Sequence, residues 1–117
     1  MQLKIRPDVT AEEGGNSMEA LWTWGGVFFG HRDGDNLWTF DGRHVGRFNG
    51  DEVYGPDGRY LGELKNGNRL ITSMNKKSRR HAAFSPHAKR IGFVPFVNYV
   101  GNVMYMGYED FPTPDVI

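Results

Sequence analysis

The chain has 117 residues and no cysteine, and its 14 Lys and Arg side chains are balanced by 14 Asp and Glu side chains. This length predicts a single domain, and the absence of cysteine excludes a disulfide framework and a thiolate metal site. A net charge of zero also argues against a dedicated nucleic-acid-binding protein, because such proteins carry a basic surplus.

The first residues predict little regular structure. Residues 2–6 alternate polar and apolar side chains and favour a short strand. Thr10 and Glu13 have the spacing of a helix capping box, but Gly14 and Gly15 limit the helix to one turn. No stretch resembles a signal peptide or reaches the roughly 20 apolar residues of a membrane-spanning helix. A cytoplasmic location and no membrane partner are therefore expected.

From residue 21 onward a 16-residue pattern occurs three times in succession. Leu-Trp-Thr-Trp-Gly-Gly at 21–26 corresponds to Leu-Trp-Thr-Phe-Asp-Gly at 37–42 and to Val-Tyr-Gly-Pro-Asp-Gly at 53–58. An apolar residue followed by glycine then recurs at constant spacing, as Phe29-Gly30, Val45-Gly46 and Leu61-Gly62. A fixed period with one supersecondary unit per period is typical of a repeat architecture.

The turns of this repeat predict β-hairpins. An Asp-Gly pair ends in Gly42 and another ends in Gly58, and such pairs favour two-residue hairpin loops with positive φ at both central positions. Gly25 and Gly26 serve the same purpose in the first copy. We therefore expect positive φ at Gly42 and Gly58.

A two-residue loop also fixes which residues face each other across each hairpin. In the second copy it pairs Leu37 with Gly46. One aromatic residue of each copy is then paired with a bulky apolar partner, and we expect these pairs to face the core: Trp22 with Phe29, Trp38 with Val45, and Tyr54 with Leu61.

The fourth copy is degenerate. Residues 69–72 favour its first strand, but the apolar-glycine pair returns only at Ile91-Gly92, so residues 89–92 favour its second strand. An insertion of about 14 residues, at about 73–88, separates the two strands. We expect a solvent-exposed loop there, more mobile than the hairpins. Residues 93–108 favour a hairpin or an extended cover over an open end of the core, and 110–117 should be irregular.

Together these elements predict an all-β fold: an eight-stranded antiparallel meander of four pseudo-repeated hairpins with an irregular C-terminal cover. The hairpin domain is expected over residues 21–94, after an N-terminal segment at 1–20 and before a cover and tail at 95–117 that belong to the same domain.

The motif Asp-Gly-Arg-x-apolar-Gly, at 41–46 and 57–62, resembles the four-fold β-flower domain, a small bacterial family. The resemblance covers about residues 21–94 and implies eight antiparallel strands in a pseudo-four-fold array. It implies no catalytic residue. The paired aromatics are also similar to the aromatic-glycine hairpin repeats of cell-wall binding modules, although no secretion signal accompanies them.

Two groups of residues are candidates for partner binding. Residues 65–90 contain eight Lys and Arg side chains and no Asp or Glu, and clustered positive charge on a loop suits phosphate contacts. A solvated loop is the simpler interpretation. Trp24 and Phe40 lie beside hairpin turns, where aromatic side chains can form an exposed binding rim. The basic candidates are Lys76, Lys77, Arg79, Arg80, Lys89 and Arg90.

The sequence favours no catalytic residue, cofactor or metal site. His31, Asp33 and Asp35 form the richest local group of ligand types, but the glycine and closing glutamate of a calcium loop are missing. No nucleophile elbow or phosphate-binding glycine loop occurs. We expect a non-catalytic binding or structural module with a protein or anionic partner. The alternatives are nucleic-acid or polyanion binding through the insertion, and carbohydrate binding through the aromatic hairpins. An enzyme is the least favoured hypothesis.

Overall fold

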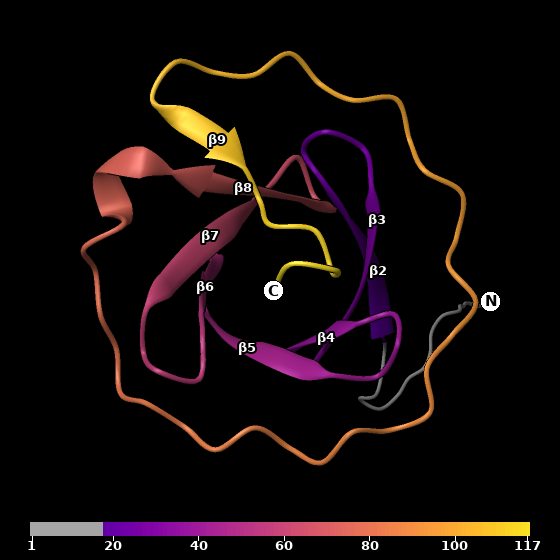
Figure 1. Cartoon of the computed structure of the whole chain (residues 1–117). Helices are drawn as coiled ribbons and strands as arrows, with labels where there is room; N and C mark the ends of the chain where they lie inside the picture. The colour runs from indigo at the N-terminus through magenta and orange to yellow at the C-terminus, as the bar shows by residue number, and fades with distance from the viewer. Residues whose placement is uncertain (1–17) are drawn as a thin grey trace, which may run out of the picture.

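The computed structural model describes residues 18–117, in which seven strands close into a small barrel and an eighth lies outside it (Figure 1). The predicted strand at 2–6 and the helical turn after Thr10 lie outside the described residues. The barrel strands are β2 (Met18–Thr23), β3 (Phe28–Asp33), β4 (Asn36–Thr39), β5 (His44–Asn49), β6 (Glu52–Tyr54), β7 (Tyr60–Lys65) and β8 (Arg69–Ser73). A single 3-10 turn, η1 (Met74–Lys76), follows β8, and β9 (Tyr108–Asp110) is the outer strand.

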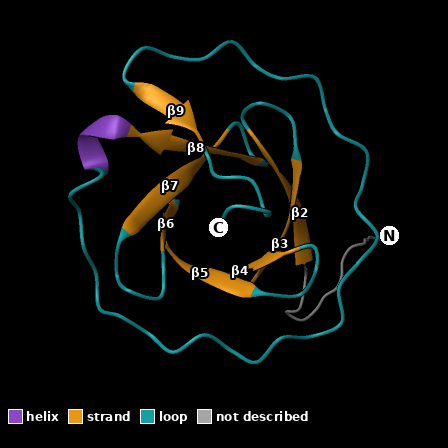
Figure 2. Cartoon of the chain, in the orientation of Figure 1, coloured by secondary structure: helices purple, strands orange, loops and turns teal. Residues whose placement is uncertain are grey.

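Each barrel strand pairs antiparallel with the next, and the barrel is closed by a parallel pairing between β2 and β8. β9 pairs antiparallel with the end of β8, beyond the part that pairs with β2. The all-β prediction is therefore confirmed. The predicted antiparallel meander is correct in part, because a parallel pairing closes it into a barrel of mixed pairing (Figure 2). None of the described residues form a helix long and apolar enough to cross a membrane.

The barrel interior is filled by the apolar positions of the repeat. Its buried members are Leu21, Phe29, Leu37, Val45, Phe48, Val53, Leu70 and Phe111. The glycine after each apolar residue lets the neighbouring strand approach closely. A Cβ on Gly62, for example, would lie 2.5 Å from the carbonyl oxygen of Ile71. The repeated apolar-glycine pair thus supplies one core side chain and one close strand contact per copy.

The hairpin loops contain three residues rather than two. In the second copy Thr39 N–H donates to the carbonyl of Arg43 at 2.9 Å, and Gly42 N–H donates to the carbonyl of Thr39 at 3.1 Å. Positive φ at Gly42 (90°) and Gly58 (84°) is confirmed, but the preceding aspartates do not share it. The loop is therefore a turn closed by one left-handed glycine, followed by a β-bulge.

The extra loop residue changes the predicted register next to the loop. Leu37 pairs with Gly46 as predicted, because a bulge restores the alignment at that point. The three predicted aromatic pairs are wrong by one residue. The observed partners are Phe28 for Trp22, His44 for Trp38 and Tyr60 for Tyr54.

The aromatic residues consequently do not join the barrel interior. Successive side chains of a strand point to opposite faces, so Leu37 faces inward and Trp38 outward. Trp38 is nevertheless buried, because a later part of the chain covers it. Its ring stacks on His44 and lies beneath the guanidinium of Arg90, whose carbon is 3.7 Å from the ring centroid.

The covering segment consists of residues 77–107, called the belt here. It runs around the outside of the barrel as one long extended loop between η1 and β9 (Figure 1). The expected second strand of a fourth hairpin at 89–92 is absent, since these residues lie in the belt. β9 pairs with β8 in its place, so the insertion is much longer than the sequence suggested. The expected loop at 73–88 begins with Ser73 still buried in β8, and its belt part is exposed but hydrogen-bonded to the hairpins.

Residues 111–117 close one end of the barrel (Figure 1). Phe111 is fully buried in the core and lies edge-to-face with Phe29, with ring centroids 5.3 Å apart. Arg43 donates to the carbonyls of Ile117 at 3.0 Å and Pro114 at 2.5 Å. The predicted irregular tail is thus a plug, and residues 93–107 cover the side of the barrel rather than its end.

Replacing Gly42 should cost more free energy of unfolding than the strain of a side chain at positive φ alone. A Cβ at Gly42 would overlap the carbonyl oxygen of Arg90 in the belt, whereas a Cβ at Gly34, also at positive φ (62°), meets no atom within 4 Å. Gly34→Ala should cost about 1 kcal/mol and Gly42→Ala about 2–4 kcal/mol in the free energy of unfolding. Urea unfolding of both variants measures the difference. Equal losses would show that the belt does not depend on this contact.

Candidate functional site

The belt has a three-residue period that divides its side chains by direction. Every third residue turns toward the barrel and packs on its outer aromatic layer. Tyr99 stacks on Trp22 with centroids 3.9 Å apart, and His87 stacks on His44 at 4.7 Å. The members of this series whose side chains contact the barrel are His81, Phe84, His87, Arg90, Phe93, Phe96, Tyr99 and Tyr105. Three residues per turn is the period of an extended polyproline II chain.

Backbone hydrogen bonds fasten the belt to the hairpin tips at intervals of nine residues. The belt donors are the N–H groups of His81, Arg90 and Tyr99, and the acceptors are the carbonyls of Gly58 (2.8 Å), Gly42 (3.0 Å) and Gly26 (2.8 Å). Nine residues of belt therefore span one 16-residue hairpin repeat. The belt passes the three hairpins in the reverse of their order along the chain.

Side chains of the barrel bind belt carbonyls from beneath. Trp22 Nε1 donates to the carbonyl of Val97 at 2.9 Å, and Trp24 Nε1 donates to that of Val103 at 2.9 Å. Between them Arg69 Nη2 donates to the carbonyl of Val100 at 3.0 Å. The backbone of this part of the belt is thus partly satisfied by the barrel itself.

The opposite series of side chains points into solvent. Between residues 91 and 106 all six members are large and apolar, and they are 80–99% exposed. They are Ile91, Val94, Val97, Val100, Val103 and Met106. We call residues 91–106 the apolar arc.

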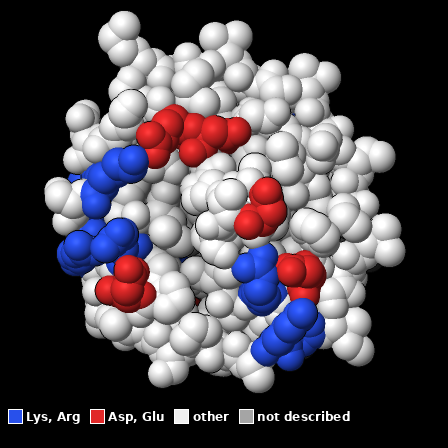
Figure 3. Space-filling model, in the orientation of Figure 1, with Lys and Arg blue, Asp and Glu red and all other residues white. Residues whose placement is uncertain are grey.

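Half-exposed rings fill the spaces between these side chains, since Phe93, Phe96, Tyr99 and Tyr105 are 42–49% exposed. No charged residue occurs from 91 to 108. In Figure 3 no charged side chain is coloured along the part of the rim where Figure 1 places the arc. A continuous uncharged strip therefore follows the outside of the molecule.

The predicted basic residues are largely paired with acidic ones. Lys76 Nζ lies 2.8 Å from Glu63 and 3.1 Å from Glu52. The residues are also distributed around the molecule, because 76–80 and 89–90 lie at different positions along the belt. The ion pairs are Lys76 with Glu63 and Glu52, Lys77 with Glu109, Arg79 with Glu52, and Arg90 with Asp33. Arg80 and Lys89 are exposed.

Lys76 belongs to a partly buried polar network. Tyr60 donates its hydroxyl to Glu63 at 2.9 Å and accepts from Ser73 N–H at 3.0 Å. The hydrogen bond to Glu63 raises the pKa of Lys76, and burial raises the pKa of Tyr60. The hydrogen bond from Tyr54 lowers the pKa of Glu52. Lys76 therefore stays protonated, Tyr60 neutral and Glu52 ionised at neutral pH, which suits a structural network.

The predicted aromatic rim is not exposed. Trp24 is only 2% exposed, because Tyr105 of the belt packs on it. Phe40 is half-buried near Phe28. His31, Asp33 and Asp35 do not converge as a set of ligands, since His31 is buried against Phe93 and Asp33 pairs with Arg90. Within residues 18–117 no three His, Asp or Glu side chains are placed to hold a metal ion.

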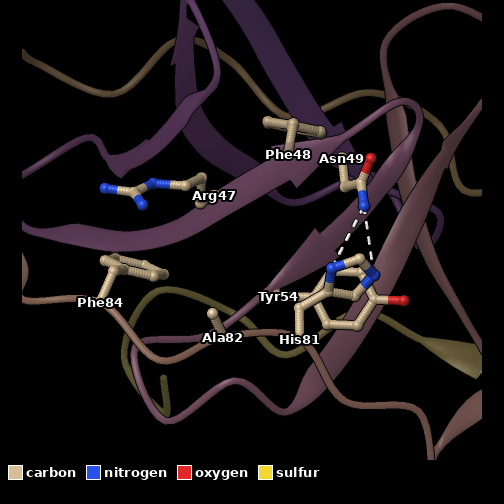
Figure 4. A pocket seen from close by; sticks show the side chains of 7 residues that line it. All are labelled: Arg47, Phe48, Asn49, Tyr54, His81, Ala82 and Phe84. Carbon is tan, nitrogen blue, oxygen red and sulfur yellow. Dashed lines mark hydrogen bonds between the residues drawn. The ribbon is translucent and has the colours of Figure 1, made fainter.

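One open pocket of about 240 Å³ lies between β5, β6 and the belt (Figure 4). The guanidinium of Arg47 stands 4.3 Å from the ring centroid of Phe84, and the amide nitrogen of Asn49 contacts the His81 ring at 3.1 Å. His81 also packs on Tyr54. None of the lining residues is Ser, Thr, Asp or Glu, so the pocket offers His81 neither an aliphatic hydroxyl nor a carboxylate.

Comparison with family models, with curated proteins and with solved structures found no match for the chain. The resemblance to the four-fold β-flower domain therefore stays a hypothesis based on the Asp-Gly-Arg-x-apolar-Gly motif.

The apolar arc was not predicted, although its signal is present in the sequence. Aliphatic side chains recur at every third position from Ile91 to Met106, and rings recur at most of the positions two residues after them. Helices and strands have periods of 3.6 and 2, so a search for those periods overlooks a period of three.

Loss of Lys76 should destabilise the protein more than loss of its neighbour Lys77. Lys76→Ala leaves the buried carboxylate of Glu63 without its cation, while the Lys77–Glu109 pair is about half exposed. We expect a loss of about 1–3 kcal/mol for Lys76→Ala and of less than about 0.5 kcal/mol for Lys77→Ala. Chemical unfolding compares them, and similar losses would contradict a structural role for the network.

Stability should fall as the pH drops below about 6.5. Burial lowers the pKa of His31 and of His44 from the ordinary value of 6.5, with a contribution from Arg90 to both and from His87 to His44. His44 Nδ1 also accepts the N–H of His87 at 2.8 Å, which requires an unprotonated nitrogen. As the pH falls, the unfolded chain therefore binds protons at these histidines before the folded chain does. The stabilisation that the neutral histidines contribute is fully present above pH 6.5 and is lost as the pH falls toward their folded-state pKa values.

The carboxylates affect stability in a lower range, because Asp41 and Glu52 have pKa values below the ordinary 3.8 and 4.5. The change in the free energy of unfolding between about pH 4.5 and 6.5 thus reflects mainly the histidines. The free energy of unfolding of the wild type should depend on pH more steeply there than that of His44→Gln. Parallel profiles would exclude His44 as a source of the dependence.

Proposed function

We propose that this chain is a non-catalytic binding module whose contact surface is the apolar arc, with the barrel as its scaffold. The observation that carries the proposal is the exposure of six large aliphatic side chains, at 80–99%, within a stretch that has no charged residue. Contiguous exposed apolar surface is uncommon on soluble monomers and marks interaction sites.

The construction of the belt supports this proposal. Its inward rings and backbone bonds hold the chain in one path, so the outward side chains are presented from an ordered backbone. A preformed surface loses less conformational entropy on binding than a flexible loop does. The binding surface proposed here also lies largely beyond the predicted basic insertion.

The two alternatives receive less support. Polyanion binding requires free positive charge, and the ion pairs of Lys76, Lys77, Arg79 and Arg90 engage most of the basic cluster. Carbohydrate binding requires an exposed aromatic platform, and Trp24 lies beneath the belt. Neither alternative explains why the outward side of the belt is aliphatic.

Hydrophobic-interaction chromatography on a phenyl resin tests the proposal. The wild type should be retained to lower salt than the triple variant Val94→Ser, Val97→Ser, Val100→Ser. As a control, Ala88→Ser changes an outward belt position outside the arc and should elute with the wild type. Co-elution of the triple variant with the wild type would reject the arc as the contact surface.

A further inference from the structure

We infer that the apolar arc binds a lipid surface regardless of the charge of its headgroups, its outward side chains inserting at the boundary between headgroups and acyl chains without crossing the bilayer. This inference rests on the proposed function and names the occupant of the same surface. Interfacial contact of this kind needs exposed apolar side chains, not a spanning segment. The sequence-based expectation of no membrane partner considered only spanning segments and signal peptides.

The shape of the arc favours a fluid partner. The belt follows the outside of the barrel (Figure 1), so the arc is convex. Two copies meeting convex side to convex side would touch over a short length, whereas stable protein interfaces bury roughly 1,200–2,000 Å². A fluid acyl layer deforms around a convex edge.

The spacing of the outward side chains also favours a lipid surface over a folded protein. Three residues of extended chain span roughly 9 Å, so neighbouring outward side chains stand well apart. A folded protein would need a separate socket for Val94, Val97 and Val100. Fluid lipid chains can pack against the valines and the rings between them without any such complementarity.

Part of the backbone of the arc is already hydrogen-bonded to the barrel. The carbonyls of Val97, Val100 and Val103 already accept hydrogen bonds from the barrel, at 2.9–3.0 Å. Tyr99 and Asn102 donate their N–H groups to hairpin tips. Because unpaired polar groups are costly to move out of water, these bonds lower the cost of inserting the middle of the arc.

The half-exposed rings suit the interface rather than the hydrocarbon interior. Tyr99 and Tyr105 combine an apolar ring with a hydroxyl, and such side chains are enriched at headgroup depth. The absence of charge from 91 to 108 means that attachment comes from apolar insertion. Binding should therefore be equal for neutral and anionic lipid and should not weaken with salt.

Vesicle flotation tests the inference directly. The probes are phosphatidylcholine vesicles and vesicles that also contain phosphatidylglycerol, each at about 50 mM and about 500 mM NaCl. The wild type should float with both kinds at both salt concentrations. Val97→Asp with Val100→Asp should lower the partition coefficient at least tenfold, while the control Ser85→Asp with Ala88→Asp should leave it unchanged. Near-UV circular dichroism reports on the packing of the aromatic side chains, among them Trp22 stacked on Tyr99, and an unchanged spectrum verifies that the variants keep the belt in place.

A second readout uses the absence of cysteine. Val100→Cys and Ser85→Cys each accept one environment-sensitive label, whose emission should shift to the blue on phosphatidylcholine vesicles at position 100 and not at position 85. Labels that respond alike at both positions would contradict insertion through the arc.

The outcomes separate this inference from the proposed function. No flotation, combined with phenyl-resin retention that still depends on the valines, overturns the lipid surface and leaves a protein as the occupant. Dimerisation that the Val97→Asp, Val100→Asp variant abolishes, seen by ultracentrifugation, would identify a second copy. Flotation only with anionic vesicles and only at low salt also overturns the inference. If the protein shows no flotation and its retention on the resin does not depend on the valines, the arc itself is rejected as a contact surface.

Discussion

The contact between hairpin tips and belt depends on glycines that have no Cβ. At Gly26, Gly42 and Gly58 the belt carbonyl occupies the space where a side chain would begin, and in all three the φ value is positive. One residue type thus meets two requirements, a left-handed turn and a close backbone approach. The regular 16-residue spacing of the tips is matched by the nine-residue spacing of the belt bonds.

This contact divides the protein into two apolar layers. Inside the barrel, aliphatic residues such as Leu37 pack around Phe111. Outside it, Trp22 and Trp38 lie between strand and belt and contact aromatic rings from both. A barrel this small encloses few side chains, and the outer layer provides burial that the interior cannot. The belt is therefore part of the folded core, although most of its residues are exposed on their outward side.

Much of the barrel could be predicted from the sequence, because local chemistry determines it. The Asp-Gly turns ending in Gly42 and Gly58 and the apolar-glycine pairs located the strands of three hairpins. The register near each loop was wrong, because two- and three-residue loops share the same turn glycine and differ only in where the bulge falls. Barrel closure between β2 and β8 involves residues about 47 positions apart, and no local pattern specifies such a pairing.

The belt was the least predictable part. The positions of its inward side chains are set by contacts with hairpins that lie tens of residues earlier in the chain. The belt backbone itself forms no strand. The lysines and arginines near its start looked like a free basic cluster, because the acidic partners Glu52 and Glu63 lie in another part of the sequence. The number of charged residues in one segment therefore does not show whether residues from elsewhere in the sequence neutralise them in the folded protein.

The position of Phe111 has a consequence for how the chain reaches this fold. Phe111 packs against Phe29, roughly 80 residues earlier, and contacts of such separation form slowly. On the ribosome the hairpins emerge first, and the barrel lacks a central side chain until the whole belt has been synthesised. During that interval the inner aliphatic residues and the outer tryptophans are both uncovered. The nascent chain thus exposes the most apolar surface, and is most prone to aggregate, after most of its strands have been synthesised and just before its last residues are added.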